Sequence, residues 1–301
     1  MKWSNLLSVV FVLTVFLSTR IAPCQDVKEQ EREDSLSLIG DPAQSSLTSS
    51  LDWAGLNRPP RTNNTAAPSI QPAPIKILIG AGHGGKDKGA QGFRISEKDL
   101  CLRIARMVKN ELQLQPQTVP LEILLTRDSD IFIPLKERVR VANERDAYLF
   151  VSIHANYSPS PKPRGFEVYF MNAEASDDEA VKLAHIENAG QVNTVKPDVL
   201  SIISDVEVTQ HIGESSRFAE TMFRSLATAV KPNGRGVRQG PFTVLSGTRM
   251  ASVLIEVGFV SNPTEASNLR RHHYLKRLSG AISSGIVDYV DQVLRKRKPL
   301  G

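Results

Sequence analysis

Four ionisable side chains lie where the sequence predicts buried or tightly turned backbone. His83 interrupts the glycine-rich stretch GAGHGGKDKGA (80–90), and His154 lies in the apolar run AYLFVSIHAN. Glu256 lies inside the apolar run SVLIEVGF, and Glu97 begins the amphipathic segment EKDLCLRIARMVKNELQ. A glutamate within an apolar strand is costly unless it is paired or used in chemistry. Two histidines and one carboxylate, with a fourth position open, form a catalytic zinc site, and the remaining glutamate can act as general base on the activated water.

The glycine-rich loop also has a phosphate-binding interpretation. However, it lacks the Lys-Ser/Thr ending of a P-loop and does not fit the G-x-G-x-x-G pattern. Glycines equally allow the backbone to approach a metal ion closely. The four side chains are dispersed along the chain without HExxH-type spacing, so the residues alone leave a metallohydrolase and a purely structural use of the histidines both open.

Alternating strands and helices are expected to position these residues. Buried apolar runs predict strands, and periodic apolar residues predict helices. The strands are expected at 75–80, 121–127, 147–156, 165–172 and 252–262, and the helices at 97–113, 134–146, 216–230 and 272–298. This alternation predicts a single α/β domain whose central sheet is mixed but largely parallel and is covered by helices on both faces. Ligands of such sheets bind outside the strand ends.

The N-terminal part of the chain differs in composition from the rest. Residues 1–24 are typical of a signal peptide, because Lys2 precedes an uncharged apolar run (6–17) that is too short to span a bilayer comfortably. A retained membrane anchor is the alternative. Residues 25–74 are charged or rich in Ser, Pro and Asn, which is typical of a flexible, disordered tether. We therefore expect export to the periplasm or another part of the cell envelope, with no stable membrane span once the signal is cleaved.

The overall charge is only weakly informative. The 301-residue chain has a formal net charge of +5, and 6% of its residues are aromatic. We expect the folded domain to span 75–295, and part of the excess positive charge lies in a basic tail (296–301) that follows it. No aromatic residues are interleaved with these cations, so we expect no nucleic-acid partner.

Five sequence blocks, in order, carry a resemblance to a known family. They are GAGHGGKDKGAQG, SEKDL, TRDSDIFIPLKERVRVAN, YLFVSIHAN and VLIEVGFVSNPTEASNL. Over about residues 75–290 the chain resembles the zinc-dependent N-acetylmuramoyl-L-alanine amidases of the amidase-3 family. The resemblance implies a peptidoglycan hydrolase that cleaves the amide between N-acetylmuramic acid and L-alanine of the stem peptide. It implies Zn²⁺ on His83, Glu97 and His154, with Glu256 as the catalytic glutamate.

One position departs from the family pattern. Gly80 stands where the family usually has an aspartate, which would be expected to brace the loop or a metal ligand. This departure supports the alternative of a degenerate, non-catalytic domain that only binds peptidoglycan. Arg127 and Arg138 lie within the matching blocks, and we expect them to pair with Asp128 or Asp130 rather than with substrate.

An insertion of about residues 173–215 separates the fourth strand from the next helix. Its capping-box pattern, Ser176 followed by Glu179, predicts the start of a helix. The insertion resembles that of the septal, activator-regulated amidases, which act in cell-wall remodelling and daughter-cell separation. In that subgroup a glutamate of the inserted helix occupies the open zinc position until an activator protein displaces it. The resemblance makes Glu187 the first candidate for this autoinhibitory role and Glu179 the second.

Overall fold

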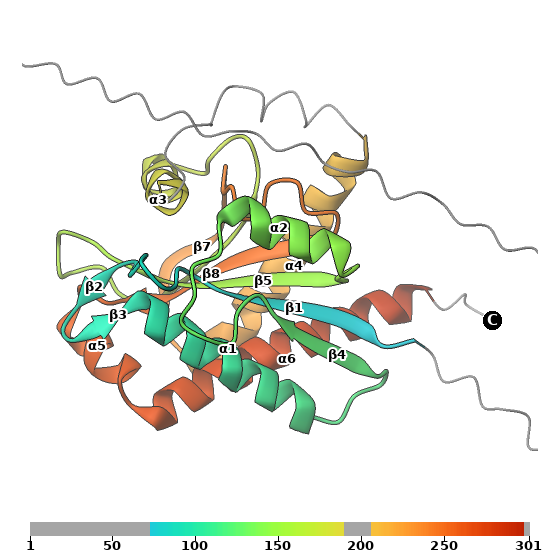
Figure 1. Cartoon of the computed structure of the whole chain (residues 1–301), viewed down its shortest axis with the longest axis horizontal. Coiled ribbons are helices and arrows are strands. Elements are labelled where there is room, and N and C mark those ends of the chain that lie inside the picture. Colours follow the sequence, from blue (N-terminus) through green and yellow to red (C-terminus); the bar gives the residue numbers. More distant parts are fainter. Residues whose placement is uncertain (1–72, 190–205, 298–301) are drawn as a thin grey trace, which may run out of the picture. The chain divides into compact units, whose positions relative to one another are not determined.

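The computed structural model describes residues 73–189 and 206–297, which form an α/β domain around one six-stranded sheet (Figure 1). From edge to edge the sheet contains β4 (Leu121–Leu125), β1 (Ile75–Ala81), β5 (Leu149–Asn156), β8 (Ala251–Phe259), β6 (Phe166–Met171) and β7 (Pro232–Gly240). The first four strands are parallel, whereas β6 runs antiparallel to β8 and β7 runs parallel to β6. The mixed, largely parallel sheet expected from the sequence is confirmed.

Helices cover both faces of the sheet. One face packs against α1 (Glu97–Leu114), α4 (Val206–Ala229) and α6 (His272–Arg297), and the larger part of the hydrophobic core lies on this side. The other face packs against α2 (Leu135–Glu144) and α3 (Asp178–Asn188), which lie on the opposite side of the sheet from α1 and α6 in Figure 1. Successive side chains of a strand alternate between these layers, as Ile77 and Leu78 of β1 do.

Short elements complete the rim of the domain. β2 (Gln91–Gly92) and β3 (Ile95–Ser96) form a small antiparallel pair directly before α1, and α5 (Pro263–Leu269) follows β8. Asn262 caps α5, because its side-chain oxygen accepts hydrogen bonds from the backbone N–H groups of Thr264 and Glu265. These elements fix the entry to α1, where Glu97 lies, and the exit from β8, the strand that carries Glu256.

The structure corrects three details of the sequence-based prediction. We expected no strand at 232–240, but this segment forms the edge strand β7. Residues 206–215, which we assigned to the insertion, are the first ten residues of α4. The N-cap of α3 is Asp177 rather than Ser176, and its carboxylate accepts a hydrogen bond from the backbone of Ala180.

Several expectations lie outside the described residues. They are the signal peptide (1–24), nearly all of the tether (25–74), the middle of the insertion (190–205) and the last four residues of the basic tail. Among the helices of residues 73–189 and 206–297, none combines the length and the apolar character needed to cross a bilayer.

Candidate metal and catalytic site

The structure brings together the three candidate metal ligands from separate parts of the chain. His83 lies in the loop that leaves β1, His154 is near the end of β5, and Glu97 is the first residue of α1. Because β1 and β5 are parallel neighbours, their carboxyl ends meet at one edge of the sheet. Glu187 of α3 joins them, and all four side chains offer a ligand atom within 4.8 Å of one another.

The distances between these atoms fit a tetrahedral metal site. Glu97 Oε1 lies 3.1 Å from His83 Nε2 and 3.2 Å from His154 Nδ1. Glu187 Oε2 lies 2.7 Å from His154 Nδ1 and 3.6 Å from His83 Nε2. Ligand atoms around a tetrahedral zinc ion, with bonds of about 2.0–2.1 Å, lie roughly 3.3 Å apart. Two imidazoles and two carboxylates are also ligands that zinc accepts, so the residues present fit this metal.

The electrostatics of the cluster favour a cation at its centre. Burial alone would lower the pKa of His83, but the Glu97 and Asp87 carboxylates outweigh this effect and raise it to about 9. Burial likewise opposes charge on His154, whereas Glu187 and Glu97 raise its pKa to about 9. The carboxylates therefore create a negative potential where the two imidazole nitrogens meet, and a metal ion in that place would experience the same attraction.

Backbone hydrogen bonds orient the Glu97 carboxylate toward the histidines. Its Oε2 accepts a hydrogen bond of 2.7 Å from the N–H of Ala90, and its Oε1 accepts one of 2.9 Å from the N–H of Ala155. Gly89, at φ 62°, passes so close that a Cβ there would lie 2.5 Å from Glu97 Oε2 and 2.6 Å from the His83 ring. The glycine-rich loop thus allows the backbone to approach these side chains closely.

Two buried arginines hold the loop that carries His83. His83 has a φ of 54°, a left-handed conformation that is strained for a residue other than glycine. Arg127 donates hydrogen bonds to the carbonyls of Ala81 and Gly82, and Arg138 donates one of 2.7 Å to the carbonyl of His83. The expected pairing of these arginines with aspartates is therefore wrong, since the described structure uses them to fix the loop.

The structure also shows what surrounds the unusual Gly80. A Cβ at this position would lie 3.0 Å from the Phe150 ring, so an aspartate would require that ring to shift. His83 is braced from within its own loop instead, because Asp87 Oδ2 lies 2.8 Å from His83 Nδ1. Hydrogen bonding to one imidazole nitrogen orients the other nitrogen toward a metal. The sequence offered a signal for Asp87, four residues after His83, that our reasoning did not use.

Glu256 lies beside the cluster in the centre of the sheet. It is the register partner of His154 on the neighbouring strand, and its side chain is completely buried. Neither carboxylate oxygen accepts a hydrogen bond from any residue in the described part of the chain. Burial, followed by the charges of Glu187, Glu97 and Glu167, raises the pKa of Glu256 well above its ordinary value. An unpaired buried carboxyl with this property is suited to proton transfer.

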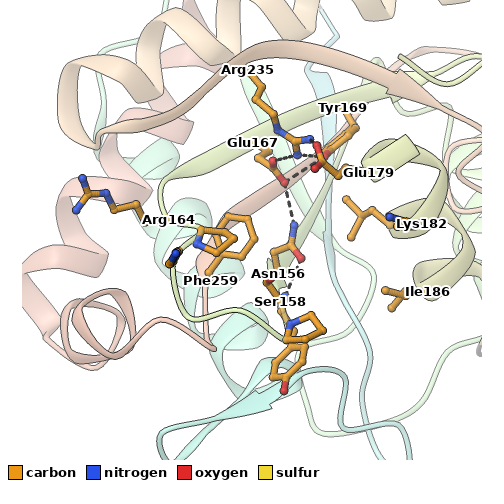
Figure 2. A pocket seen from close by; sticks show the side chains of 15 residues that line it. Asn156, Ser158, Arg164, Glu167, Tyr169, Glu179, Lys182, Ile186, Arg235 and Phe259 are labelled. Carbon is orange, nitrogen blue, oxygen red and sulfur yellow. Dashed lines mark hydrogen bonds and ion pairs between the residues drawn. The ribbon is translucent and has the colours of Figure 1, made fainter. Parts of the chain in front are cut away.

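A second buried glutamate, which the sequence analysis did not single out, lies opposite Glu256. Glu167 of β6 is the antiparallel register partner of Glu256 and is also completely buried. Its Oε2 accepts hydrogen bonds from Asn156 (2.9 Å) and from the Tyr169 hydroxyl (3.0 Å), and its Oε1 is paired with Arg235 of β7 (Figure 2). The rule that drew attention to Glu256, a glutamate within an apolar strand, would have found Glu167 in FEVYFM as well.

The fold agrees with comparisons to known proteins. The family model described as N-acetylmuramoyl-L-alanine amidase (amidase-3) matches residues 77–288. The chain belongs to this family. It is 33% identical over 221 residues to the amidase AmiA of Escherichia coli K12, covering 71% of this chain and 75% of AmiA. It is 32% identical over 223 residues to the amidase AmiC of an E. coli O6:H1 strain, covering 72% of this chain but only 53% of AmiC.

Solved structures of amidases show the same fold. The catalytic domain of the amidase CwlV from Bacillus (Paenibacillus) polymyxa matches with a TM-score of 0.55 and 32% identity, covering 72% of this chain and 98% of that domain. The amidase AmiC2 of Nostoc punctiforme matches with a TM-score of 0.55 and 27% identity, covering 72% of this chain and 97% of AmiC2. The present chain spans about half the length of the E. coli AmiC that it matches.

Proposed function

We propose that this protein is a zinc-dependent peptidoglycan hydrolase that cleaves the amide between N-acetylmuramic acid and the L-alanine of the stem peptide. The observation that carries the proposal is the convergence of His83, Glu97 and His154 on one point, beside the buried and unpaired Glu256. Family membership supports the choice of substrate.

His83, Glu97 and His154 would hold the zinc ion in this proposal. When bound, zinc supplies Lewis-acid chemistry, because it polarises a carbonyl and makes water more acidic. The apolar strand around Glu256 raises its affinity for a proton, so this carboxylate takes the proton of the attacking water and delivers it to the leaving amine of L-alanine. Asp87 and the two buried arginines position His83 and its loop.

We include autoinhibition by the insertion in the proposal. Glu187 of α3 contributes the fourth oxygen of the cluster, so it occupies the position that a catalytic zinc site keeps open for water and substrate. Its side chain is only 8% exposed. Activation therefore requires α3 to withdraw, and a binding partner that captures the insertion would supply the free energy for that step. Glu179 lies at the other end of α3 and is not part of the cluster.

The location and biological role follow from the substrate. A peptidoglycan hydrolase acts in the cell envelope, which agrees with the signal peptide expected at residues 1–24. An amidase kept inactive until a partner binds is suited to wall remodelling and daughter-cell separation, where cleavage must be confined in place and time.

The alternative, a degenerate domain that binds peptidoglycan without cutting it, rests on Gly80. One experiment separates the two functions. Purified protein is assayed for bound zinc and then incubated with isolated sacculi, with and without the Glu187→Ala substitution. We expect one zinc per chain and release of soluble stem peptide, increased by the substitution. Sacculus binding without release of peptide by either protein would favour the alternative.

A further inference from the structure

A large cavity lies next to the candidate catalytic residues and plays no part in the metal site. Its volume is about 670 Å³, and it lies between the end of β5, strands β6 and β7, and helix α3 (Figure 2). Glu167, the register partner of Glu256, contributes to its wall. The cavity therefore lies close to Glu256, the carboxylate proposed to transfer protons. A substrate cut at that place needs room there for one of its two parts. We call it the β7 cavity.

A second cavity of about 500 Å³ is lined by three of the four cluster residues, His83, Glu97 and Glu187. The two cavities share Asn156 and Tyr157 at the end of β5, and they share Leu183 and Ile186 on α3. Helix α3 therefore divides a single groove, with its N-terminal part over the β7 cavity and its C-terminal part over the metal cluster. The groove would be continuous if α3 withdrew, as the proposed activation requires.

The two halves of the groove differ in charge. The β7 cavity is lined by four cationic residues (Lys162, Arg164, Lys182 and Arg235) and two acidic residues (Glu167 and Glu179). The metal half is lined by Asp87, Glu97 and Glu187 and by no lysine or arginine. The β7 cavity therefore offers cationic side chains to a carboxylate of the substrate, whereas the lining of the metal half offers none.

Arg235 makes two kinds of contact within the β7 cavity. Its Nη2 is paired with Glu167, which belongs to the sheet and is fixed by further hydrogen bonds. Its Nη1 is paired with Glu179 of α3 and lies 3.6 Å from Asp177, the N-cap of the same helix. The Glu179 side chain is 66% exposed, so the Arg235–Glu179 pair can exchange with a carboxylate arriving from solvent.

We propose that Arg235 is the subsite for a carboxylate of the stem peptide and that Glu179 occupies this subsite in the closed protein. The inference rests on the proposed amidase function. Helix α3 then imitates the substrate at two points, with Glu187 at the metal ligands and Glu179 at Arg235. Withdrawal of the helix exposes both points together, and a peptide carboxylate replaces Glu179 on the guanidinium group. Arginine suits this role because its planar fork binds carboxylates in a fixed orientation.

The spacing of the two glutamates indicates which carboxylate is bound. Glu179 and Glu187 are eight residues apart on α3, a separation of about 12 Å along the helix axis at about 1.5 Å per residue. An extended peptide covers this length in about three to four residues, at roughly 3.3–3.6 Å each. Arg235 therefore selects substrates whose peptide carries a free carboxylate at the third or fourth residue from the cleaved amide.

The test uses the full chain with zinc and the Glu187→Ala substitution, which opens the metal site. Two soluble muramoyl-tripeptides are compared, one ending in a carboxylate and the other in a carboxamide. We expect KM for the acid to be at least about tenfold lower than KM for the amide. Adding Arg235→Gln should raise KM for the acid to that of the amide and leave kcat unchanged. Adding Glu179→Gln should lower KM for the acid, because the competing carboxylate is removed.

Two further variants control for folding. Arg235→Lys keeps the positive charge beside Glu167 and should give an intermediate KM for the acid. Arg249→Gln changes an arginine in the loop before β8, which contacts Asn143, and should leave the ratio of the two KM values unchanged. Equal KM values for acid and amide in the Glu187→Ala protein would overturn the subsite and leave the amidase function standing. Hydrolysis of neither substrate by any variant would contradict the amidase function and the subsite with it.

Discussion

Glu256 and His154 are register partners on the adjacent parallel strands β8 and β5. This pairing places a carboxyl with no hydrogen-bond partner among the described residues beside a buried imidazole that lies 3.2 Å from Glu97. Neighbouring residues in register point to the same face of a sheet. The two strands thus fix the relative positions of the proposed metal ligand and the proposed proton-transfer group without any contribution from loops.

Replacing Glu256 with glutamine should separate metal binding from catalysis. We expect the Glu256→Gln variant to keep its zinc, because Glu256 is not part of the ligand cluster, and to lose about 10²- to 10⁴-fold in kcat. Zinc content and the rate of peptide release are measured on the same preparation. Glu122→Gln, on the exposed side of β4, is the control and should keep full activity. A fully active Glu256→Gln enzyme would refute the assigned role.

Replacing His154 should weaken metal binding. The His154→Ala variant loses one of three proposed ligands, so we expect its Kd for zinc to be at least about tenfold higher than that of the original protein, taking each ligand as worth at least about 1.4 kcal/mol. His211→Ala is the matched control, since His211 lies on α4 beside Glu214, away from the cluster. Equilibrium dialysis with zinc measures the difference. An unchanged Kd for zinc in the His154→Ala protein would exclude this residue as a ligand.

Replacing Glu187 should activate the enzyme. The proposed autoinhibition is a coupling between α3 and the metal site, and such couplings typically change an equilibrium constant by about 5- to 150-fold. We expect Glu187→Ala to raise basal peptide release from sacculi within this range. Glu174→Ala, before α3, is the control and should have no effect. Deleting 173–215 would be a poorer test, because Ser215 of α4 accepts a hydrogen bond from the buried backbone of Ser252. A basal rate unchanged by Glu187→Ala would count against autoinhibition.

The buried Glu256 also predicts how stability depends on pH in metal-free protein. Its pKa is raised in the folded state and lies near 4.5 when it is unperturbed. Above the unperturbed value the folded state binds more protons than the unfolded state, so the contribution of Glu256 to stability is lost as pH rises. The Glu256→Gln variant has no such loss. Thermal unfolding should show it to be more stable than the original protein at about pH 7, and equally stable at about pH 4. An equal difference at both pH values would contradict the raised pKa.

Much of the fold could be read from the sequence, because its buried elements have a clear apolar pattern. The run LFVSIHAN is buried on both faces in the middle of a parallel sheet, and only its last residue is partly exposed. The strand PNGRGVRQG was missed because an edge strand needs less apolar surface and this one carries three glycines. Its turn-like composition is more typical of the loop after a helix than of a strand.

The site was predictable only in part. Glu256 stands out because a glutamate interrupts an apolar strand, and Glu167 carries the same signal. No sequence pattern singled out Arg235. Its proposed role depends on Glu167 and on Glu179 of the inserted helix, which lies 56 residues earlier in the chain. The roles of Arg127 and Arg138 could not be predicted from the sequence for a related reason. They bind backbone carbonyls of the His83 loop, and a sequence does not show where carbonyl groups lie.

The most direct test of the account is analysis of the bond that the protein cuts. Zinc-loaded Glu187→Ala protein is incubated with purified sacculi, and the soluble products are identified by mass spectrometry and by labelling of new amino groups. The account predicts free stem peptides whose new amino terminus is L-alanine, and no such release after zinc is removed by a chelator. Products that retain the link between muramic acid and L-alanine, or release unaffected by the chelator, would contradict it.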